Sequence, residues 1–175
     1  MKRLIFMAIA AALLLAIPST IDAKQRKKTA AKHRTEKDVR QSSVERRVLG
    51  KHLLTLQWIS WESYGSVTIK KEADGTLSCR GEQLARKCPK GTEQGNIDND
   101  DYVKLDGTIE IVDKDHLIFN GEIRTKVYHI NNGQEVLRQG TFNFVTKENR
   151  HYWRMQEQLN PADECTDYID IYYSK

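Results

Sequence analysis

One stretch of the sequence decides the fold: YVKLDGTIEIVDKDHLIFNGEIRTKVYHINNGQEVLRQGTFNFV, residues 102–145. Apolar or small residues alternate with polar ones over residues 103–111, over 119–127 and, more weakly, over 140–144. A strand turns successive side chains to opposite faces, so each segment has one buried and one solvated face. The connections include Asn132-Gly133, and Asn-Gly is the dipeptide typical of hairpins. The stretch therefore predicts an antiparallel meander.

Glycines occupy inward-facing positions on all three segments: Gly107, Gly121 and Gly140. Glycine weakens a strand unless the strand bends or another group approaches it closely. Three such glycines on successive strands predict a sheet that coils tightly enough to close on itself. Two interpretations stay open: curvature alone, or a hollow left for a ligand or for the tryptophans elsewhere in the chain.

Further short strands are predicted on both sides of the meander. They cover residues 53–61, 66–71, 76–80, 151–155 and 168–173. The first of them, LLTLQWISW, is apolar on both faces, so we expect both faces to be covered. The short spacing and the absence of a convincing helix predict an all-β fold. We expect a single antiparallel meander barrel of about eight strands, made by residues 48–175.

The first 23 residues have the pattern of a secretory signal peptide. Lys2 and Arg3 precede an apolar run over residues 4–17, Pro18 breaks it, and Ala23 is a small residue suited to a cleavage site. The run is too short to anchor the chain as a membrane span. We therefore expect an exported protein, periplasmic or secreted, that is soluble and has no membrane span.

The next segment, Lys24–Arg47, has ten Lys or Arg against three Asp or Glu. With few aliphatic residues it is predicted to be a disordered basic tail. Residues 48–175 carry sixteen Lys or Arg and twenty Asp or Glu, so the domain itself is mildly acidic. Basic arms bind polyanions, and the expected partner of an exported arm is an anionic envelope surface or a protein. A solvated linker without a partner is the alternative, and nucleic acid is not expected.

The chain has three cysteines, Cys79, Cys88 and Cys165. A disulfide between Cys79 and Cys88 would close a small loop and is the favoured pairing, with Cys79–Cys165 as the alternative. No CxxC pair is present, which argues against zinc. Residues 96–101, NIDNDD, lack the glycine and the closing glutamate of a calcium loop. We therefore expect no metal site.

Nothing in the sequence predicts catalysis. The histidines occur singly, and neither a GxSxG elbow nor a phosphate-binding loop is present. We therefore expect a protein that is not an enzyme and needs no cofactor.

The most distinctive segments lie near the C-terminus: RHYWR, residues 150–154, and DYIDIYY, residues 167–173. Consecutive strands usually pair and opposite charges favour facing positions, so we expect the Arg154 guanidinium within reach of Asp170 or Asp167. Such a pair is either a structural strut on the barrel wall or the polar anchor of an apolar pocket. The second interpretation makes these residues the candidate ligand site: Trp58, Trp61, Phe119, Phe142, Trp153, Arg154 and Asp170.

A family resemblance follows from these features. The signal peptide, Gly50 ahead of Trp58, and eight meandering strands resemble the lipocalin-like, or calycin, barrels over residues 49–173. The ending HYWR…DYIDIYY is similar to that of small secreted bacterial proteins. The resemblance implies a closed eight-stranded barrel and assigns no binding residue.

Two functions are expected from different classes. The first is an exported binding protein whose barrel holds an apolar or amphipathic small molecule or an envelope component. The second is an interaction module whose basic tail docks on an anionic envelope surface. A barrel interior packed with aromatic side chains would count against a small molecule inside it.

Overall fold

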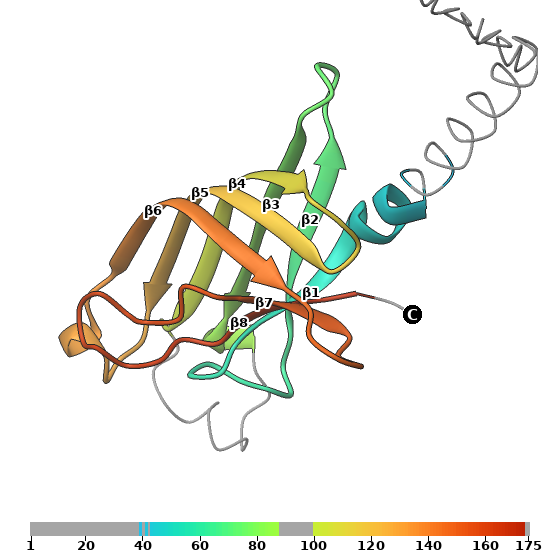
Figure 1. Cartoon of the computed structure of the whole chain (residues 1–175). Coiled ribbons are helices and arrows are strands. Elements are labelled where there is room, and N and C mark those ends of the chain that lie inside the picture. Colours follow the sequence, from blue (N-terminus) through green and yellow to red (C-terminus); the bar gives the residue numbers. More distant parts are fainter. Residues whose placement is uncertain (1–38, 40, 42, 88–99, 174–175) are drawn as a thin grey trace, which may run out of the picture. The chain divides into compact units, whose positions relative to one another are not determined.

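The computed structural model describes residues 39, 41, 43–87 and 100–173. Eight strands make one closed antiparallel barrel, in which each strand pairs with the next and β1 pairs with β8 (Figure 1). The strands are β1 Gly50–Leu56, β2 Gly65–Lys71, β3 Leu77–Leu84, β4 Tyr102–Ile111, β5 His116–Lys126, β6 Val136–Val145, β7 Tyr152–Met155 and β8 Ile169–Tyr172. The predicted all-β meander barrel is confirmed.

The alternation read from the sequence sets which side chains enter the core. On β4, Val103, Leu105 and Ile109 are buried, while Lys104, Asp106 and Thr108 face solvent. On β5 the same phase buries Leu117 and Phe119. The inward set from all strands forms a continuous hydrophobic core. Burial of this set is the dominant favourable contribution to folding, because it removes apolar surface from water.

The three inward glycines lie side by side across the sheet, since Gly107 pairs with Gly121 and Gly121 with Gly140. A Cβ at Gly107 would lie 2.3 Å from the Asn120 carbonyl oxygen and 2.8 Å from Phe119 Cζ. At Gly107 and Gly121 the strands approach too closely for a side chain, whereas a Cβ at Gly140 would meet nothing within 4 Å. The curvature interpretation fits this packing, and the group that lies against Gly107 and Gly121 is the Phe119 ring, which is neither a ligand nor a tryptophan.

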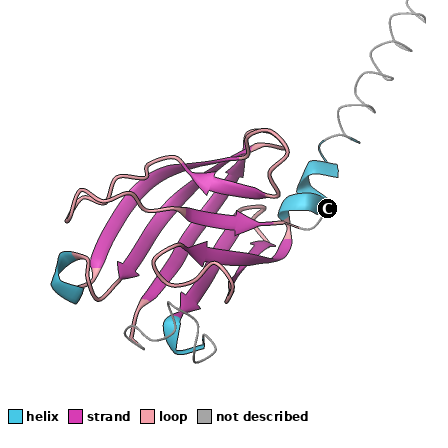
Figure 2. Cartoon of the chain, turned by 90° about the horizontal axis from the view of Figure 1, so that it is seen from below, coloured by secondary structure: helices cyan, strands magenta, loops and turns pink. Residues whose placement is uncertain are grey.

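Backbone pairing in the barrel wall is sparsest between β6 and β7. Only Phe144↔Met155 and Val145↔Arg154 pair β6 with β7. Beyond them the loop of residues 156–168 runs along β6, and the Gln156 amide donates to the Asn143 carbonyl at 2.8 Å. Figure 2 shows this long connection crossing the barrel wall beside the strands. The loop thus continues the wall where backbone pairing has stopped.

One local prediction was wrong. The first strand ends at Leu56 instead of reaching residue 61, because the chain turns there, with the Ile59 amide donating to the Leu56 carbonyl at 2.9 Å. The predicted connection at Asn132-Gly133 does join two antiparallel strands, β5 and β6, and residues 131–133 form a 3-10 turn within it, η2 Asn131–Gly133. Asn131 and Asn132 both adopt positive φ, 51° and 53°, a conformation that asparagine tolerates better than most residues.

A short helix over residues 43–48 precedes β1, although no helix was predicted and these residues were expected to end the tail or begin the domain. Val48 is fully buried in the core, and Val44 and Leu49 pack against it. The compact unit accordingly begins at Val39. The predicted signal peptide, and the tail up to residue 38, lie outside the described residues. Within the described residues, no helix is long and apolar enough to cross a membrane.

Candidate functional site

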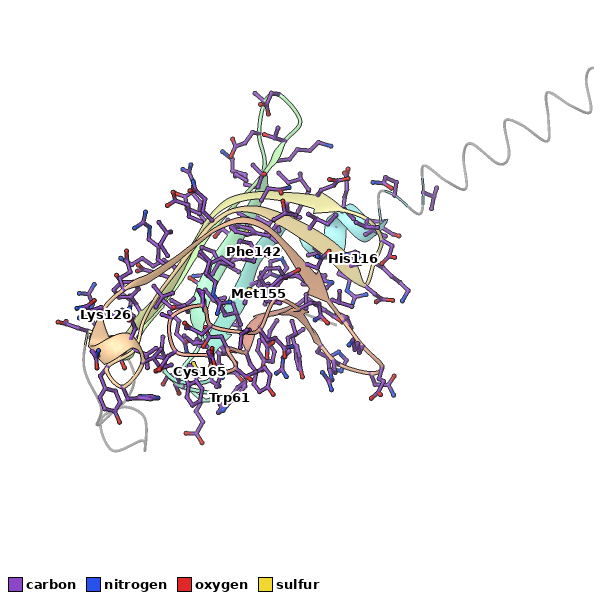
Figure 3. All side chains as sticks on the ribbon, turned by 60° about the vertical axis from the view of Figure 1, so that its left-hand side comes forward. Trp61, His116, Lys126, Phe142, Met155 and Cys165 are labelled. Atoms are coloured by element: carbon purple, nitrogen blue, oxygen red, sulfur yellow. The ribbon has the colours of Figure 1, made fainter. Side chains whose placement is uncertain are left out.

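Three of the predicted ligand-site aromatics fill the barrel. Phe119 and Trp153 are fully buried, and Phe142 is 7% exposed. Phe119 lies 6.2 Å, centroid to centroid, from Phe142 and from Phe144. Phe142 and Met155 appear within the arch of the sheet in Figure 3. These rings occupy the interior that the ligand hypothesis had reserved for a small molecule.

The two remaining tryptophans lie apart from this cluster. Trp58 is half-buried, and its Nε1 donates to Asp167 Oδ1 at 2.9 Å. Its ring also meets the edge of His129 at 5.4 Å. Trp61 is 38% exposed and lies at the periphery in Figure 3. The structure does not bring the predicted site residues into one pocket.

Arg154 and Asp170 form the expected ion pair. The two residues face each other across β7 and β8, and Arg154 Nε and Nη2 donate to the two Asp170 oxygens, both at 2.7 Å. Their neighbours Trp153 and Ile171 point into the core, so the pair lies on the outer face of the wall. The Asp170 side chain is nonetheless fully buried, and that of Arg154 is 16% exposed. This geometry matches a strut that joins the last two strands.

Tyrosines cover this strut. The Arg154 guanidinium carbon lies 4.2 Å from the ring centroid of Tyr168 and 5.0 Å from that of Tyr152. Tyr172 contacts Tyr152 at 5.1 Å and Tyr64 at 5.3 Å. The rings exclude water from an outward-facing charge pair, which explains how Asp170 is buried without pointing into the barrel.

The pKa directions of the pair follow from this burial. Desolvation raises the pKa of Asp170 above its usual 3.8, although the hydrogen bonds from Arg154 act in the opposite direction. The hydrogen bonds that Arg154 donates to Asp170 raise the pKa of Arg154, so the guanidinium stays charged. For the ionised Asp170 carboxylate, the unfavourable effect of desolvation therefore exceeds the favourable effect of Arg154.

A second buried ion pair joins β6 to the end of the long loop, and the sequence analysis missed it. Arg138 Nη2 donates to Asp167 Oδ2 at 2.7 Å, with the side chains 6% and 1% exposed. Arg138 Nη1 also donates to the Glu157 carbonyl at 2.9 Å, and Asn160 Nδ2 donates to Asp167 Oδ2 at 2.9 Å. Desolvation lowers the pKa of Arg138. The network fixes the loop against the barrel.

The described cysteines carry free thiols. Cys79 is fully buried in the core, and burial raises its pKa to about 12. Cys165 is partly buried beside Asp167, and the predicted alternative bridge Cys79–Cys165 is absent. Cys88 lies outside the described residues, so its pairing with Cys79 stays a prediction.

An open hollow of about 760 Å³ lies where the helix of residues 43–48 meets the barrel. Its lining is Ser43, Arg46, Arg47, Leu49, Lys51, His52, His151 and Tyr173. Three of these residues are cationic, two are histidines, and none is acidic. We refer to this feature as the cationic hollow.

Aromatic rings hold Arg47 in the hollow. Its guanidinium carbon lies 3.8 Å from the ring centroid of Tyr173 and 5.6 Å from that of Trp153. Trp153 in turn contacts Tyr173 at 4.3 Å and the edge of His52 at 5.8 Å. Because a carbonyl oxygen only accepts, His52 Nε2 must donate to the Val48 carbonyl, 2.7 Å away. The hollow therefore has a fixed aromatic floor.

Sequence reasoning divided the members of the hollow between unrelated segments. Arg47 was counted in the tail, and His52 and His151 were recorded as isolated histidines. Closure of the barrel brings them together, since β1 pairs with β8 and the Tyr173 amide donates to the His151 carbonyl at 3.1 Å. No spacing rule signals a site assembled from both ends of a domain.

Comparison with known proteins places this chain among its relatives. Residues 28–173 match the PM1083 family. The uncharacterized protein PM1083 of Pasteurella multocida (strain Pm70) is 39% identical over 132 residues, which cover 75% of this chain and 77% of that protein. No solved structure matches the chain significantly. The match spans both the helix and the whole barrel, and the chain belongs to the PM1083 family.

Proposed function

We propose that this protein is an exported interaction module that docks on an anionic surface of the cell envelope and performs no catalysis. The barrel serves as a rigid head, and basic residues at the end where the chain enters it make the contact. The observation that carries the proposal is the cationic hollow, whose lining has three cationic side chains and no acidic one.

The distribution of charge supports this assignment. The basic segment Lys24–Arg47 ends at Arg47, which lines the hollow, whereas residues 48–175 are acidic overall. A basic patch on an otherwise acidic protein attracts polyanions and orients the protein as it approaches.

The packing of the barrel argues against the other expected function. Trp153, Phe119 and Phe144 are among the largest fully buried side chains, and all three belong to the core. A ligand site needs space lined by apolar and polar groups. Side chains occupy the interior here, so we place recognition on the outside of the barrel.

Two of the described histidines make hydrogen bonds of a structural kind, which supports a role other than catalysis. His52 donates to a backbone carbonyl, and His116 Nε2 lies 2.9 Å from Asn143 Oδ1. General base catalysis requires the base within hydrogen-bond reach of a nucleophile or of the proton it removes. The partners of these two histidines are structural.

Vesicle binding tests the proposal. The mature chain should co-sediment with phosphatidylcholine vesicles that contain phosphatidylglycerol and not with pure phosphatidylcholine. Raising the salt concentration from about 50 mM to about 200 mM should weaken this binding by at least tenfold, because the attraction is electrostatic. Binding that does not change with salt concentration, or equal binding to neutral vesicles, would refute the proposal.

Intact-mass analysis tests the proposed export, and it should find residue 24 at the N-terminus of the exported protein.

A further inference from the structure

We propose that the cationic hollow binds a phosphate group, supplied either by a free phosphomonoester or by a lipid headgroup. This inference rests on the proposed function, because it names the group that the docking surface recognises. It goes further in one respect: it requires a defined site, whereas docking by net charge alone needs only a basic surface.

The conformation of Arg47 is the first observation. The guanidinium lies 3.8 Å from the Tyr173 centroid, so one of its faces is occupied by the aromatic ring. Stacking leaves the N–H groups at the edge of the guanidinium plane available to donate. Among the described residues, no carboxylate lies within salt-bridge distance of Arg47. An arginine that is stacked on a ring and has no carboxylate partner can donate two parallel hydrogen bonds to an oxyanion.

The second observation is the arrangement of the other donors. Lys51 comes from β1 and His151 from the residue before β7, so donors approach the hollow from different elements than Arg47 does. A phosphate group has three terminal oxygens and a charge of about −1.5 to −2 near neutral pH. Donors on several sides suit this tetrahedral anion better than a planar carboxylate with two oxygens.

The nearest acidic side chain on the helix does not compete for this site. Glu45 pairs with Lys71, with 3.4 Å between Oε1 and Nζ. It is absent from the lining of the hollow. The described lining therefore presents cationic side chains and no carboxylate to a bound anion.

Titration calorimetry on the mature chain tests the site with glycerol 3-phosphate and inorganic phosphate, and with acetate as the planar comparison. Arg47→Gln should weaken binding of glycerol 3-phosphate about tenfold or more, the loss expected for a charge-assisted fork. Arg47→Lys keeps the charge and should recover only part of the affinity. The matched control is Arg80→Gln, which removes the same charge from an exposed position on β3 and should leave binding unchanged.

Several outcomes would overturn the site. These are no binding of either phosphate compound, binding of acetate as tight as that of phosphate, or equal losses in Arg47→Gln and Arg80→Gln. Thermal melts check that each variant is folded. If Arg47→Gln does not fold, Lys51→Gln, an exposed change, replaces it and must also weaken phosphate binding.

Vesicle measurements identify the source of the phosphate. Phosphatidic acid presents a phosphomonoester, and phosphatidylglycerol does not. If the wild type prefers phosphatidic acid vesicles over phosphatidylglycerol vesicles of equal charge, and Arg47→Gln loses this preference, the source is a lipid headgroup. Binding of glycerol 3-phosphate without binding to any vesicle supports a free phosphomonoester and refutes the proposed function alone. Salt-sensitive vesicle binding that is the same in Arg47→Gln and Arg80→Gln refutes the site alone.

Discussion

Arg154→Ala and Asp170→Ala remove opposite halves of one ion pair, and we expect unequal losses of stability. The Asp170 side chain is fully buried, whereas that of Arg154 keeps 16% of its surface exposed. Removing the arginine strands a carboxylate that water does not reach. Removing the aspartate leaves a guanidinium that can turn toward solvent along the rings of Tyr152 and Tyr168.

The expected magnitudes follow from these exposures. Loss of one partner from a buried pair costs about 3–5 kcal/mol, and we expect Arg154→Ala in this range. Asp170→Ala should cost about 2–3 kcal/mol, because the two lost charge-assisted hydrogen bonds are partly replaced by hydration of the arginine. The double replacement Arg154→Met with Asp170→Leu should lie within about 1 kcal/mol of the wild type or be more stable.

The pKa of Asp170 explains why the double variant should be as stable as the wild type. Burial raises this pKa above 3.8 despite the attraction of Arg154. The folded state therefore holds the Asp170 proton more tightly than the unfolded state does. The contribution of Asp170 to stability is fully present below pH 3.8 and is lost as the pH rises through the raised pKa. At neutral pH the ionised pair should consequently be no better than an apolar pair of similar volume.

Urea unfolding of the wild type, the two single variants and the double variant measures these differences, provided that the m-value stays constant. Equal losses in the two single variants would contradict the argument from exposure. Losses below about 1 kcal/mol would mean that the pair behaves as a surface salt bridge. A double variant as unstable as the sum of the single variants would show that the replaced residues act through packing alone.

Three further predictions concern the barrel. In denaturant melts, Gly107→Ala should lower the unfolding free energy by about 3 kcal/mol or prevent folding, since its Cβ would lie 2.3 Å from a backbone oxygen. Gly140→Ala should lower it by only about 1 kcal/mol, because a Cβ there meets open space and only the φ of 143° is unfavourable. Asp167→Ala should lower the unfolding free energy by about 3–5 kcal/mol, because it leaves Arg138 buried without its partner. It should also shift the fluorescence of Trp58, whose indole loses its hydrogen-bond acceptor, and an unchanged spectrum would contradict that contact. In the reduced protein, Cys79 should react with a thiol reagent only after unfolding, and labelling of the native protein would refute its burial.

Local pattern was sufficient for most of the fold. Alternation with period two identified the long strands. The register argument placed Arg154 within reach of Asp170 or Asp167, because the strands are close in sequence, and the structure pairs it with Asp170. The errors arose where side chains override the pattern. Residues 57–61 are apolar enough for a strand, but Gln57 instead binds the loop, with its Nε2 donating to the Thr166 carbonyl and its Oε1 accepting from the Tyr168 amide.

The candidate sites depended on contacts that no local pattern contains. The alternation read from the sequence covered residues 140–144 and assigned no face to Arg138, which shares the inward phase of Val136 and Phe142. Its partner Asp167 lies in a loop, where periodicity gives no phase. The cationic hollow requires Arg47 and His151 to meet across a closed barrel, and closure is a property of the whole domain.

The two buried ion pairs have a common structural role, which bears on where function resides. Both lie at the thin part of the wall: Arg154–Asp170 joins β7 to β8, and Arg138–Asp167 joins β6 to the loop that replaces a strand. Strands this short supply few backbone hydrogen bonds, and the buried charges specify their register instead. The charged groups at the seam are paired with each other, and of their buried side-chain nitrogen and oxygen atoms only Arg138 Nε lacks a hydrogen-bond partner among the described residues. Among the described residues, no carboxylate lies within salt-bridge distance of Arg47, so recognition is expected there and not inside the barrel.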